Sequence, residues 1–429
     1  MLALHIFAVA AAAEPEGDRR PKIGLVLSGG GARGIAHVGV IKVLEEAGIR
    51  PDYIAGTSMG SIVGAMYAIG YDAATLDKLA LTMDWNDILD DRVSHRHLSM
   101  QEKLGDGRYA FSFPLRNGQV SLPSGYIPGQ KLAMELARLT LPVHNVRDFN
   151  KLTIPFICVA TDIETGKARV FDRGYLPDAL RASMAIPSIF IPVEIDGHLY
   201  ADGGIVLNFP VSETRARGAD IIIGVDVQTP LYRKDELNSL ARIMEQSVYF
   251  LGEISNERER ALCDTLITPD VSGFTASSFE NPGELIRRGE EAARAKLPEI
   301  LALLKSPPTE RTAPTVPLAS RDEKRFITAI RIRGLDKVSK NLVRGALGLK
   351  TPAMMSYEDI ESAIDRVYGT MFFERVEYRL EPDPPGERLV IRVKESTTNW
   401  FKVGIHYDSD SNAALLLNTT FRNIAGEGS

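Results

Sequence analysis

Ser58 is the residue best placed to act as a nucleophile, because it stands in the sequence Gly56-Thr57-Ser58-Met59-Gly60. This G-x-S-x-G form is typical of a nucleophile elbow, a sharp turn from a strand to a helix that exposes the serine hydroxyl at the edge of a sheet. The pattern therefore predicts serine chemistry on an ester.

A glycine-rich loop, Ser28-Gly29-Gly30-Gly31-Ala32-Arg33-Gly34, precedes the elbow. When serine attacks an ester carbonyl, the carbonyl oxygen gains a negative charge that backbone N–H groups stabilise. The amides of Gly29, Gly30 and Gly31 follow a strand and precede a helix, where they can point outward toward such an oxygen. Met59, directly after the serine, is a further predicted donor. The sequence thus predicts an oxyanion hole made of these amides.

A third turn, Asp202-Gly203-Gly204, follows the extended run His198 to Ala201 and offers a carboxylate as general base. An aspartate with an ordinary pKa of about 3.9 is a weak base toward serine, so a short Ser58–Asp202 hydrogen bond in a partly dry cleft is required. In the hydrolase order of serine, acid and histidine, the histidine would have to be His406, which lies far beyond this domain. His37 is predicted to have a packing role.

Two alternatives compete with this interpretation. The glycine loop also matches G-x-G-x-x-G, the fingerprint of a dinucleotide site. Such a site needs an acidic residue near the end of the second strand, but the predicted strand Tyr53 to Ala55 ends in the elbow itself. A P-loop is excluded because Gly-Lys-Ser/Thr is missing. Taken alone, Asp202-Gly203 would be an ordinary turn without chemistry, but its combination with the other two turns favours a catalytic site.

These turns lie within a regular alternation of apolar strands and amphipathic helices. The predicted strands are Ile23 to Leu27, Tyr53 to Ala55, Ile154 to Ala160 and Ile221 to Val227, and the predicted helices are Ala36 to Ala47, Ser61 to Ile69, Glu236 to Cys263 and Glu284 to Leu304. Continuous apolar strands of this kind are covered on both faces. The predicted fold class is therefore α/β with a mainly parallel central sheet.

The alternation fails between Asp90 and Pro128. There, Phe111, Phe113 and the Asn117-Gly118 pair predict a small hairpin inserted near the edge of the sheet. The insertion is either decoration or a cover over a lipid-binding cleft, and decoration is the more common case.

A second kind of pattern follows residue 305. Residues 306–322 are predicted to be a proline-rich linker, and residues 323–396 form a β-α-α-β-β unit, which predicts a separate small α+β domain. Residues 397–429 contain two amphipathic strands, Trp400 to Asp408 and Ala414 to Arg422. Two strands are not stable by themselves, so they are expected to belong to a larger sheet.

Composition narrows the function classes. The 429 residues carry a net charge of -6, with 50 basic and 56 acidic residues, which argues against binding of nucleic acid. Residues 1–13 resemble the apolar core and cleavage site of a secretory signal, although no basic residue follows Met1. The chain is therefore expected to be exported. Cys158 and Cys263 are expected to be buried free thiols.

The three turns, in this order, resemble those of the patatin family of lipid acyl hydrolases. The segment Ala182 to Phe190 is also similar to the one that this family has between its nucleophile and its aspartate, and the resemblance runs from about Lys22 to Leu304 within a domain of residues 20–305. It implies a patatin-like three-layer fold, a Ser58–Asp202 dyad without histidine, no metal or other cofactor, and phospholipid or other fatty-acyl ester substrates at a membrane surface. Gly34, Gly56, Gly60, Gly203 and Gly204 would support the motifs. Arg33 matches a basic position that orients the loop or meets a lipid phosphate; otherwise it is an ordinary exposed arginine.

The remaining chain resembles a POTRA domain over residues 323–396, followed by the first strands of an outer-membrane surface-antigen barrel over 397–429. Signal, patatin, POTRA and barrel together resemble bacterial patatin-type autotransporters, with the barrel truncated here. This architecture implies a location at the outer membrane or cell surface, with release of the hydrolase domain as an option. A lipid-binding face would also allow a homodimer. The competing hypothesis is a transport or assembly module in which the hydrolase fold is a passenger.

Overall fold

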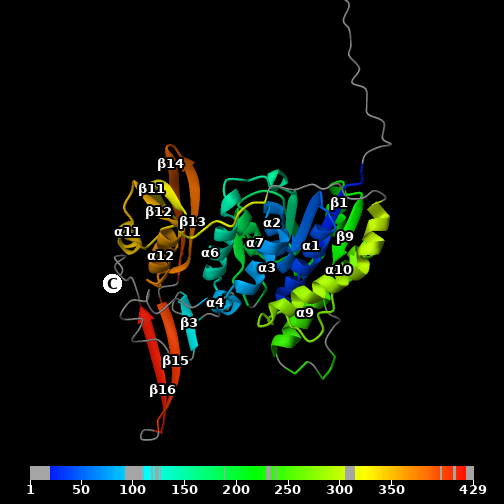
Figure 1. The fold of residues 1–429 in the computed structure, drawn as a ribbon. Coiled ribbons are helices and arrows are strands. Elements are labelled where there is room, and N and C mark those ends of the chain that lie inside the picture. The colour runs from blue at the N-terminus through cyan, green and yellow to red at the C-terminus, as the bar shows by residue number, and fades with distance from the viewer. Residues whose placement is uncertain are drawn as a thin grey trace, which may run out of the picture.

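The structure is a computed structural model that describes residues 20–91, 109, 111–116, 119–120, 125, 127–187, 189–228, 233–235, 237–238, 240–304, 315–396, 399–408 and 412–421. Three sheets organise this part of the chain (Figure 1). The largest belongs to the N-terminal domain, the second to a small domain beside it, and the third contains the last two described strands. The three predicted turns all lie in the first of these units.

The central sheet is mixed, with a parallel centre. Its strand order is β10 (Thr265–Ile267), β9 (Ile221–Val225), β1 (Ile23–Leu27), β2 (Tyr53–Thr57), β5 (Phe156–Asp162), β8 (His198–Asp202) and β7 (Val193–Ile195), with β6 (Lys167–Phe171) also paired to β5. The strands from β10 to β5 pair in parallel, whereas β8, β7 and β6 are antiparallel to their neighbours. The predicted α/β class with a mainly parallel sheet is confirmed.

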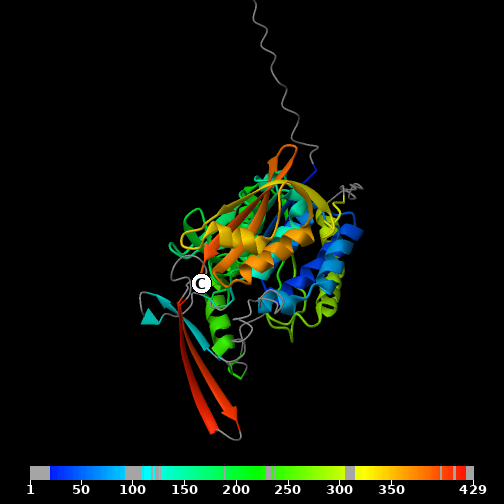
Figure 2. The same ribbon diagram turned by 90° about the vertical axis from the view of Figure 1, so that its left-hand side faces the viewer.

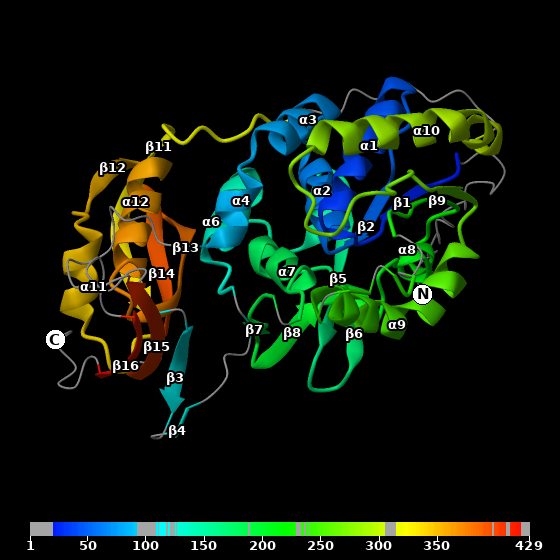
Figure 3. The same ribbon diagram turned by 90° about the horizontal axis from the view of Figure 1, so that it is seen from below.

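Helices cover both faces of this sheet. They are α1 (Ala36–Glu46), α2 (Met59–Ile69), α3 (Ala73–Thr82), α7 (Leu176–Ser183), α8 (Val211–Ala216), α9 (Leu240–Arg260) and α10 (Pro282–Leu304). Because side chains alternate along a strand, Leu25 and Leu27 of β1 enter the large core, whereas Val26 packs with Phe209 and Val211 in a smaller one. Figure 3 shows α1, α2, α3 and α10 on one side of the sheet and α8 and α9 on the other, which gives three layers.

Shorter elements complete the N-terminal domain. They are α4 (Trp85–Asp90), α6 (Gln130–Leu139) and the 3-10 turns η1 (Gly31–Ile35), η2 (Leu141–Val143), η3 (Phe149–Lys151) and η4 (Gly203–Ile205).

Both cysteines are free, but only Cys158 is fully buried, so the prediction of burial is wrong for the partly exposed Cys263. Among the described helices, none has both the length and the hydropathy to cross a bilayer.

The small domain is a four-stranded sheet with two helices. Its strands follow the order β12 (Ala353–Ser356), β11 (Lys324–Arg333), β14 (Gly386–Glu395) and β13 (Phe373–Asp383), and its helices are α11 (Lys340–Leu347) and α12 (Tyr357–Tyr368). The predicted β-α-α-β-β order omitted β12, which is short and leads straight into the capping box of Ser356 at the start of α12. Strands β11 and β14 are parallel to each other, so this sheet is mixed.

The third sheet corrects the predicted position of the hairpin. Strands β3 (Phe111–Arg116) and β4 (Gln119–Val120) do form an antiparallel pair, but β3 pairs with β15 (Asn399–Asp408) and not with the central sheet. Strand β15 in turn pairs with β16 (Asn412–Phe421). Figures 1 and 2 show β15 and β16, in red, projecting away from both domains. An edge strand can pair with any free edge, and local sequence does not specify which.

The predicted linker is partly packed. Residues 305–314 lie outside the described residues, but Val316 donates its N–H to the carbonyl of Gly70 at 3.0 Å, and Leu318 packs against the large core. The chain therefore runs along the N-terminal domain before it enters β11. The predicted signal segment, residues 1–13, also lies outside the described part of the chain.

Candidate active site

Ser58 occupies a strained backbone conformation between β2 and α2. Its φ of 53° and ψ of -127° lie in a region that residues with a side chain rarely adopt. The strand ends at Thr57 and the helix begins at Met59, so the turn leaves a single residue at its tip. This is the geometry of a nucleophile elbow, and it lifts the serine side chain out of the sheet.

Asp202 contacts Ser58 directly, because the sheet brings the ends of β2 and β8 together. Strand β5 extends past β2, and its extra length pairs with β8, which places Asp202 opposite Ala160. Ser58 Oγ donates a hydrogen bond to Asp202 Oδ2 at 2.7 Å. The other oxygen, Oδ1, accepts the N–H of Gly204 at 2.7 Å. The two carboxylate oxygens are thus divided between the serine and the turn that holds the aspartate.

Burial makes this carboxylate a better base. Ser58 is 5% exposed and Asp202 is 6% exposed. Burial raises the pKa of Asp202 to about 6, although the hydrogen bonds from Gly204 and Ser58 act in the opposite direction. A carboxylate with a pKa near neutrality accepts a proton from serine more readily than one at the ordinary value. The short hydrogen bond and the dry surroundings that the sequence argument required are present at this pair.

Three of the four predicted oxyanion donors have a backbone N–H group without a hydrogen-bond partner among the described residues. The N–H groups of Gly30, Gly31 and Met59 form no hydrogen bond within the described part of the chain. The N–H of Gly29, in contrast, is donated to the carbonyl of Asn208 at 3.2 Å. The prediction of Gly29 as a donor is therefore corrected, because its hydrogen is already engaged by the protein.

Gly29 is instead required for close packing against the nucleophile. A Cβ at Gly29 would lie 3.0 Å from Ser58 Cβ and 2.3 Å from Asn208 Oδ1. The other motif glycines are also tightly packed: a Cβ would come within 2.5 Å of a neighbouring heavy atom at Gly34, Gly56, Gly60 and Gly203, and would lie 3.0 Å from Asp202 Oδ1 at Gly204. These glycines let the three turns approach one another.

Arg33 and His37 support the glycine loop from inside. Arg33 is 1% exposed and its Nε donates to the carbonyl of Gly30 at 3.2 Å, so the alternative of an ordinary exposed arginine is wrong. His37 is fully buried, and its Nε2 contacts the carbonyl of Ser28 at 2.8 Å. Because a carbonyl only accepts, Nε2 carries the hydrogen. Burial lowers the pKa of His37 to about 4, so this ring is neutral and has the predicted packing role.

Two residues that the motifs did not identify hold the site in place. Ser183, at the end of α7, accepts the N–H of Ser58 at 3.0 Å and donates to the carbonyl of Val159 at 2.6 Å. Asn208 donates its side-chain amide to the carbonyl of Gly29 at 3.2 Å. Ser183 lies in the segment that resembles the patatin family, and this resemblance could have identified it as a site residue. Asn208 stands in no motif.

One group among the described residues could offer three ligands to a metal. Atoms of Asp162, Glu164 and His198 lie within 4.8 Å of one another. Glu164 and His198 are exposed, and Asp162 already accepts the N–H groups of Glu164 and Thr165. Exposed acidic clusters of this kind are common without a metal, and we assign none to it.

Two family models match parts of this chain. Residues 25–215 match the family model of patatin-like phospholipases, and residues 326–396 match the POTRA model, described as a surface antigen variable number repeat. The chain thus contains a patatin-like phospholipase domain, with the expected patatin-like α/β fold, and a POTRA domain.

Relatives extend over about half of this chain. An uncharacterized NTE family protein of Mycobacterium bovis is 36% identical over 217 residues, which are 51% of this chain and 52% of that protein. A lysophospholipase of Saccharomyces cerevisiae is 35% identical over 221 residues, which are 50% of this chain and 12% of that protein. The chain therefore matches about half the length of the mycobacterial relative and a small part of the yeast enzyme.

Among solved structures, VipD of Legionella pneumophila gives a TM-score of 0.39 at 18% identity, covering 66% of this chain and 67% of that one. Human GIVD cytosolic phospholipase A2 gives 0.32 at 14% identity, covering 68% and 60%. These scores are low, and the fold assignment rests on the sheet order and the family match.

Proposed function

We propose that the patatin-like domain is a serine lipid acyl hydrolase of the phospholipase A type, which cleaves fatty-acyl esters of phospholipids with a Ser58–Asp202 dyad. The observation that supports it most is the 2.7 Å hydrogen bond from Ser58 Oγ to Asp202 Oδ2. A buried serine hydroxyl on a strained turn, bonded to a carboxylate of raised pKa, is the arrangement expected of an activated nucleophile. The yeast relative is named a lysophospholipase, which supports a lipid substrate.

In the proposed reaction, Asp202 accepts the Ser58 proton as Oγ attacks the acyl carbonyl. The amides of Gly30, Gly31 and Met59 stabilise the negative oxygen of the tetrahedral intermediate. The intermediate collapses to an acyl-serine, and the proton on Asp202 passes to the departing alcohol. Water, deprotonated by Asp202, then attacks the acyl-serine and releases the fatty acid, and the proton on Asp202 returns to Ser58 Oγ. No histidine takes part.

The experiment that tests this proposal is a product analysis of mixed phospholipid vesicles incubated with the full chain. Wild-type protein should release fatty acids and lysophospholipids, and Ser58→Ala should release neither while keeping its fold. Ser247→Ala is a suitable control, because this serine is exposed on α9 and its hydroxyl bonds the Ile243 carbonyl of the same helix at 2.7 Å. Equal product from wild type and Ser58→Ala would refute the assignment.

For location, we propose that the protein is exported and held at the bacterial outer membrane or cell surface, as in patatin-type autotransporters. The POTRA match supports this proposal. In β16, Leu415, Leu417 and Phe421 are 66%, 61% and 59% exposed, and alternating apolar residues of this kind suit a strand that faces lipid. Membrane fractionation with and without residues 397–429 tests this proposal, because loss of those residues should release the protein into the soluble fraction.

The competing proposal is a transport or assembly module with a passenger hydrolase fold. The POTRA match is compatible with it as well. The two proposals differ in the vesicle assay: a folded, inactive wild-type chain would favour the module, and turnover that depends on Ser58 would favour the enzyme. Whether the protein acts as a homodimer is tested by its mass in solution.

A further inference from the structure

Arg181 is a buried cation whose hydrogen-bonding capacity is largely unused. It lies on α7 and is 2% exposed. Its Nη2 donates to the carbonyl of Pro128 at 3.1 Å, and the guanidinium stands over the Phe190 ring, 4.6 Å from its centre. Its Nε and Nη1 have no acceptor among the described residues. Buried charged donors are strongly unfavourable without a partner, so this one calls for a bound group.

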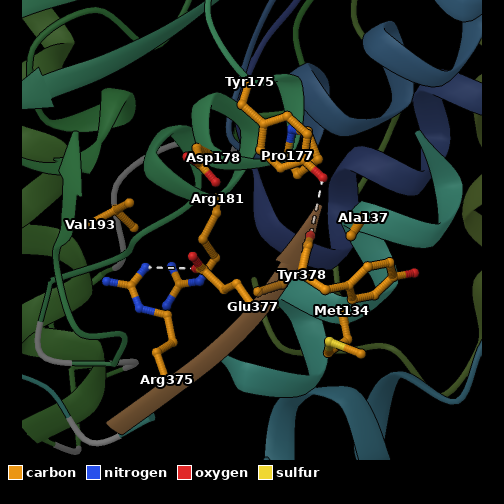
Figure 4. A pocket seen from close by; sticks show the side chains of 11 residues that line it. Met134, Ala137, Tyr175, Pro177, Asp178, Arg181, Val193, Arg375, Glu377 and Tyr378 are labelled. Atoms are coloured by element: carbon orange, nitrogen blue, oxygen red, sulfur yellow. Dashed lines mark hydrogen bonds and ion pairs between the residues drawn. The ribbon is translucent and has the colours of Figure 1, made fainter. Parts of the chain in front are cut away.

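The cavity that Arg181 lines lies between the two domains (Figure 4). Helices α6 and α7 form its wall in the patatin-like domain, and β13 contributes Arg375 and Tyr378 from the POTRA domain. The cavity volume is about 10 Å³, which suits one water or one monatomic ion. Phosphate and sulfate are too large for it.

The charges around this cavity do not balance. The charged groups that interact there are Arg181, Arg375, Arg379, Arg392, Asp91, Asp178 and Glu377. Four are positive and three are negative, which leaves one positive charge. Asp178 is already paired with Arg379 and lies 3.7 Å from Arg392, and Glu377 is paired with Arg375 at 3.3 Å. Burial and the neighbouring Arg375 lower the pKa of Arg181 to about 9, while Asp91 and Glu377 act in the opposite direction.

We propose that this cavity binds one monatomic anion of the halide class, chloride under ordinary conditions, between Arg181 and Arg375. Guanidinium N–H groups only donate hydrogen bonds, so Arg181 and Arg375 together offer several donors and no acceptor. The two carboxylates that line the cavity, Asp178 and Glu377, are paired with Arg379 and Arg375. An anion accepts from every remaining donor, whereas water would bring two hydrogens of its own. The bound anion joins α7 to β13 and so stabilises the contact between the two domains. This site is independent of the proposed hydrolysis.

Thermal unfolding of the full chain in sodium chloride and in sodium gluconate, at equal ionic strength, tests the site. Gluconate is too large to enter. We expect the melting temperature to be about 2–4 °C higher in chloride, with saturation as the concentration rises, and bromide to replace chloride. Arg375→Gln should abolish this difference. Arg388→Gln is the matched control, because Arg388 lies on β14, pairs with Asp383 and does not line the cavity, so its chloride response should remain.

A crystal of the wild-type chain soaked in bromide gives a readout that needs no variant. The expected result is an anomalous peak between the side chains of Arg181 and Arg375. Equal melting temperatures in chloride and gluconate would overturn the proposal. A water at the position of the expected peak would overturn it too, as would a chloride response that Arg375→Gln leaves intact.

Discussion

Replacing Asp202 with asparagine should abolish activity and yet stabilise the fold at neutral pH. Burial holds the pKa of Asp202 at about 6, above its ordinary value of 3.8. The folded state therefore binds this proton more tightly than the unfolded chain does, and the stability it contributes is fully present below pH 3.8 and is lost as the pH rises through about 6. At pH 7.5 the ionised carboxylate is a net cost that the fold bears for the sake of the dyad.

The size of this cost follows from the pKa. The pKa of Asp202 is higher by about 2 in the folded state than in the unfolded chain, which corresponds to roughly 3 kcal/mol of free energy of unfolding. Asparagine is neutral at every pH and can still accept the N–H of Gly204, while its NH2 group can donate to Ser58 Oγ. We therefore expect Asp202→Asn to be more stable than wild type by about 1–3 kcal/mol at pH 7.5, with an advantage that shrinks toward pH 4.

The assay is urea unfolding of both proteins between pH 4 and pH 8, with ester hydrolysis measured in parallel. For wild type, kcat/KM should fall about tenfold per pH unit below pH 6, and Asp202→Asn should lose about 10²–10⁴-fold at pH 7.5. Asp322→Asn makes the same chemical change at an exposed position and should alter neither property. An asparagine variant less stable than wild type at pH 7.5, or a flat activity profile through pH 6, would refute the reasoning.

Three further predictions follow from particular contacts. Ser58→Gly should be about 1 kcal/mol more stable than Ser58→Ala in urea unfolding, because glycine relieves the strain at φ 53° and both variants lack the hydroxyl; equal stabilities would contradict the strain. Ser183→Ala should cost about 2 kcal/mol of stability and lower kcat more than it changes KM, since it leaves the Ser58 N–H and the Val159 carbonyl unpaired; unchanged kcat would exclude a positioning role. Gln130→Met should weaken the contact between the domains by about 1–3 kcal/mol, because the Gln130 amide bonds both the N–H and the carbonyl of Val376. Limited proteolysis should then cut the variant faster than wild type between residues 305 and 323. An unchanged rate of cleavage would contradict this role of Gln130.

Much of the site could be predicted because its motifs encode local geometry. A G-x-S-x-G turn after a strand specifies the backbone around Ser58 almost by itself, and parallel strands place the turns after β1 and β2 at the same edge of the sheet. The position of Asp202 needed more than this. Strand β8 runs antiparallel to β5, and only the extra length of β5 past β2 brings Asp202 to the serine.

The predictions that failed depend on contacts between distant segments. The amide of Gly29 looked available in sequence, but Asn208, far along the chain, accepts its hydrogen. The hairpin at β3 and β4 was correctly predicted as a local structure. Its pairing with β15 could not be predicted, because the local sequence does not determine which free strand edge β3 pairs with. Arg33 is the one charged residue of the glycine-rich loop, and it is buried in the folded loop, where its Nε donates to the Gly30 carbonyl.

The most direct measurement for the dyad and its oxyanion hole is a crystal structure of the chain after reaction with an alkyl fluorophosphonate. The account predicts a phosphorus atom bonded to Ser58 Oγ and a phosphoryl oxygen about 2.7–3.1 Å from the amide nitrogens of Gly30, Gly31 or Met59. Attachment at another residue, or a phosphoryl oxygen that points away from these amides, would contradict it.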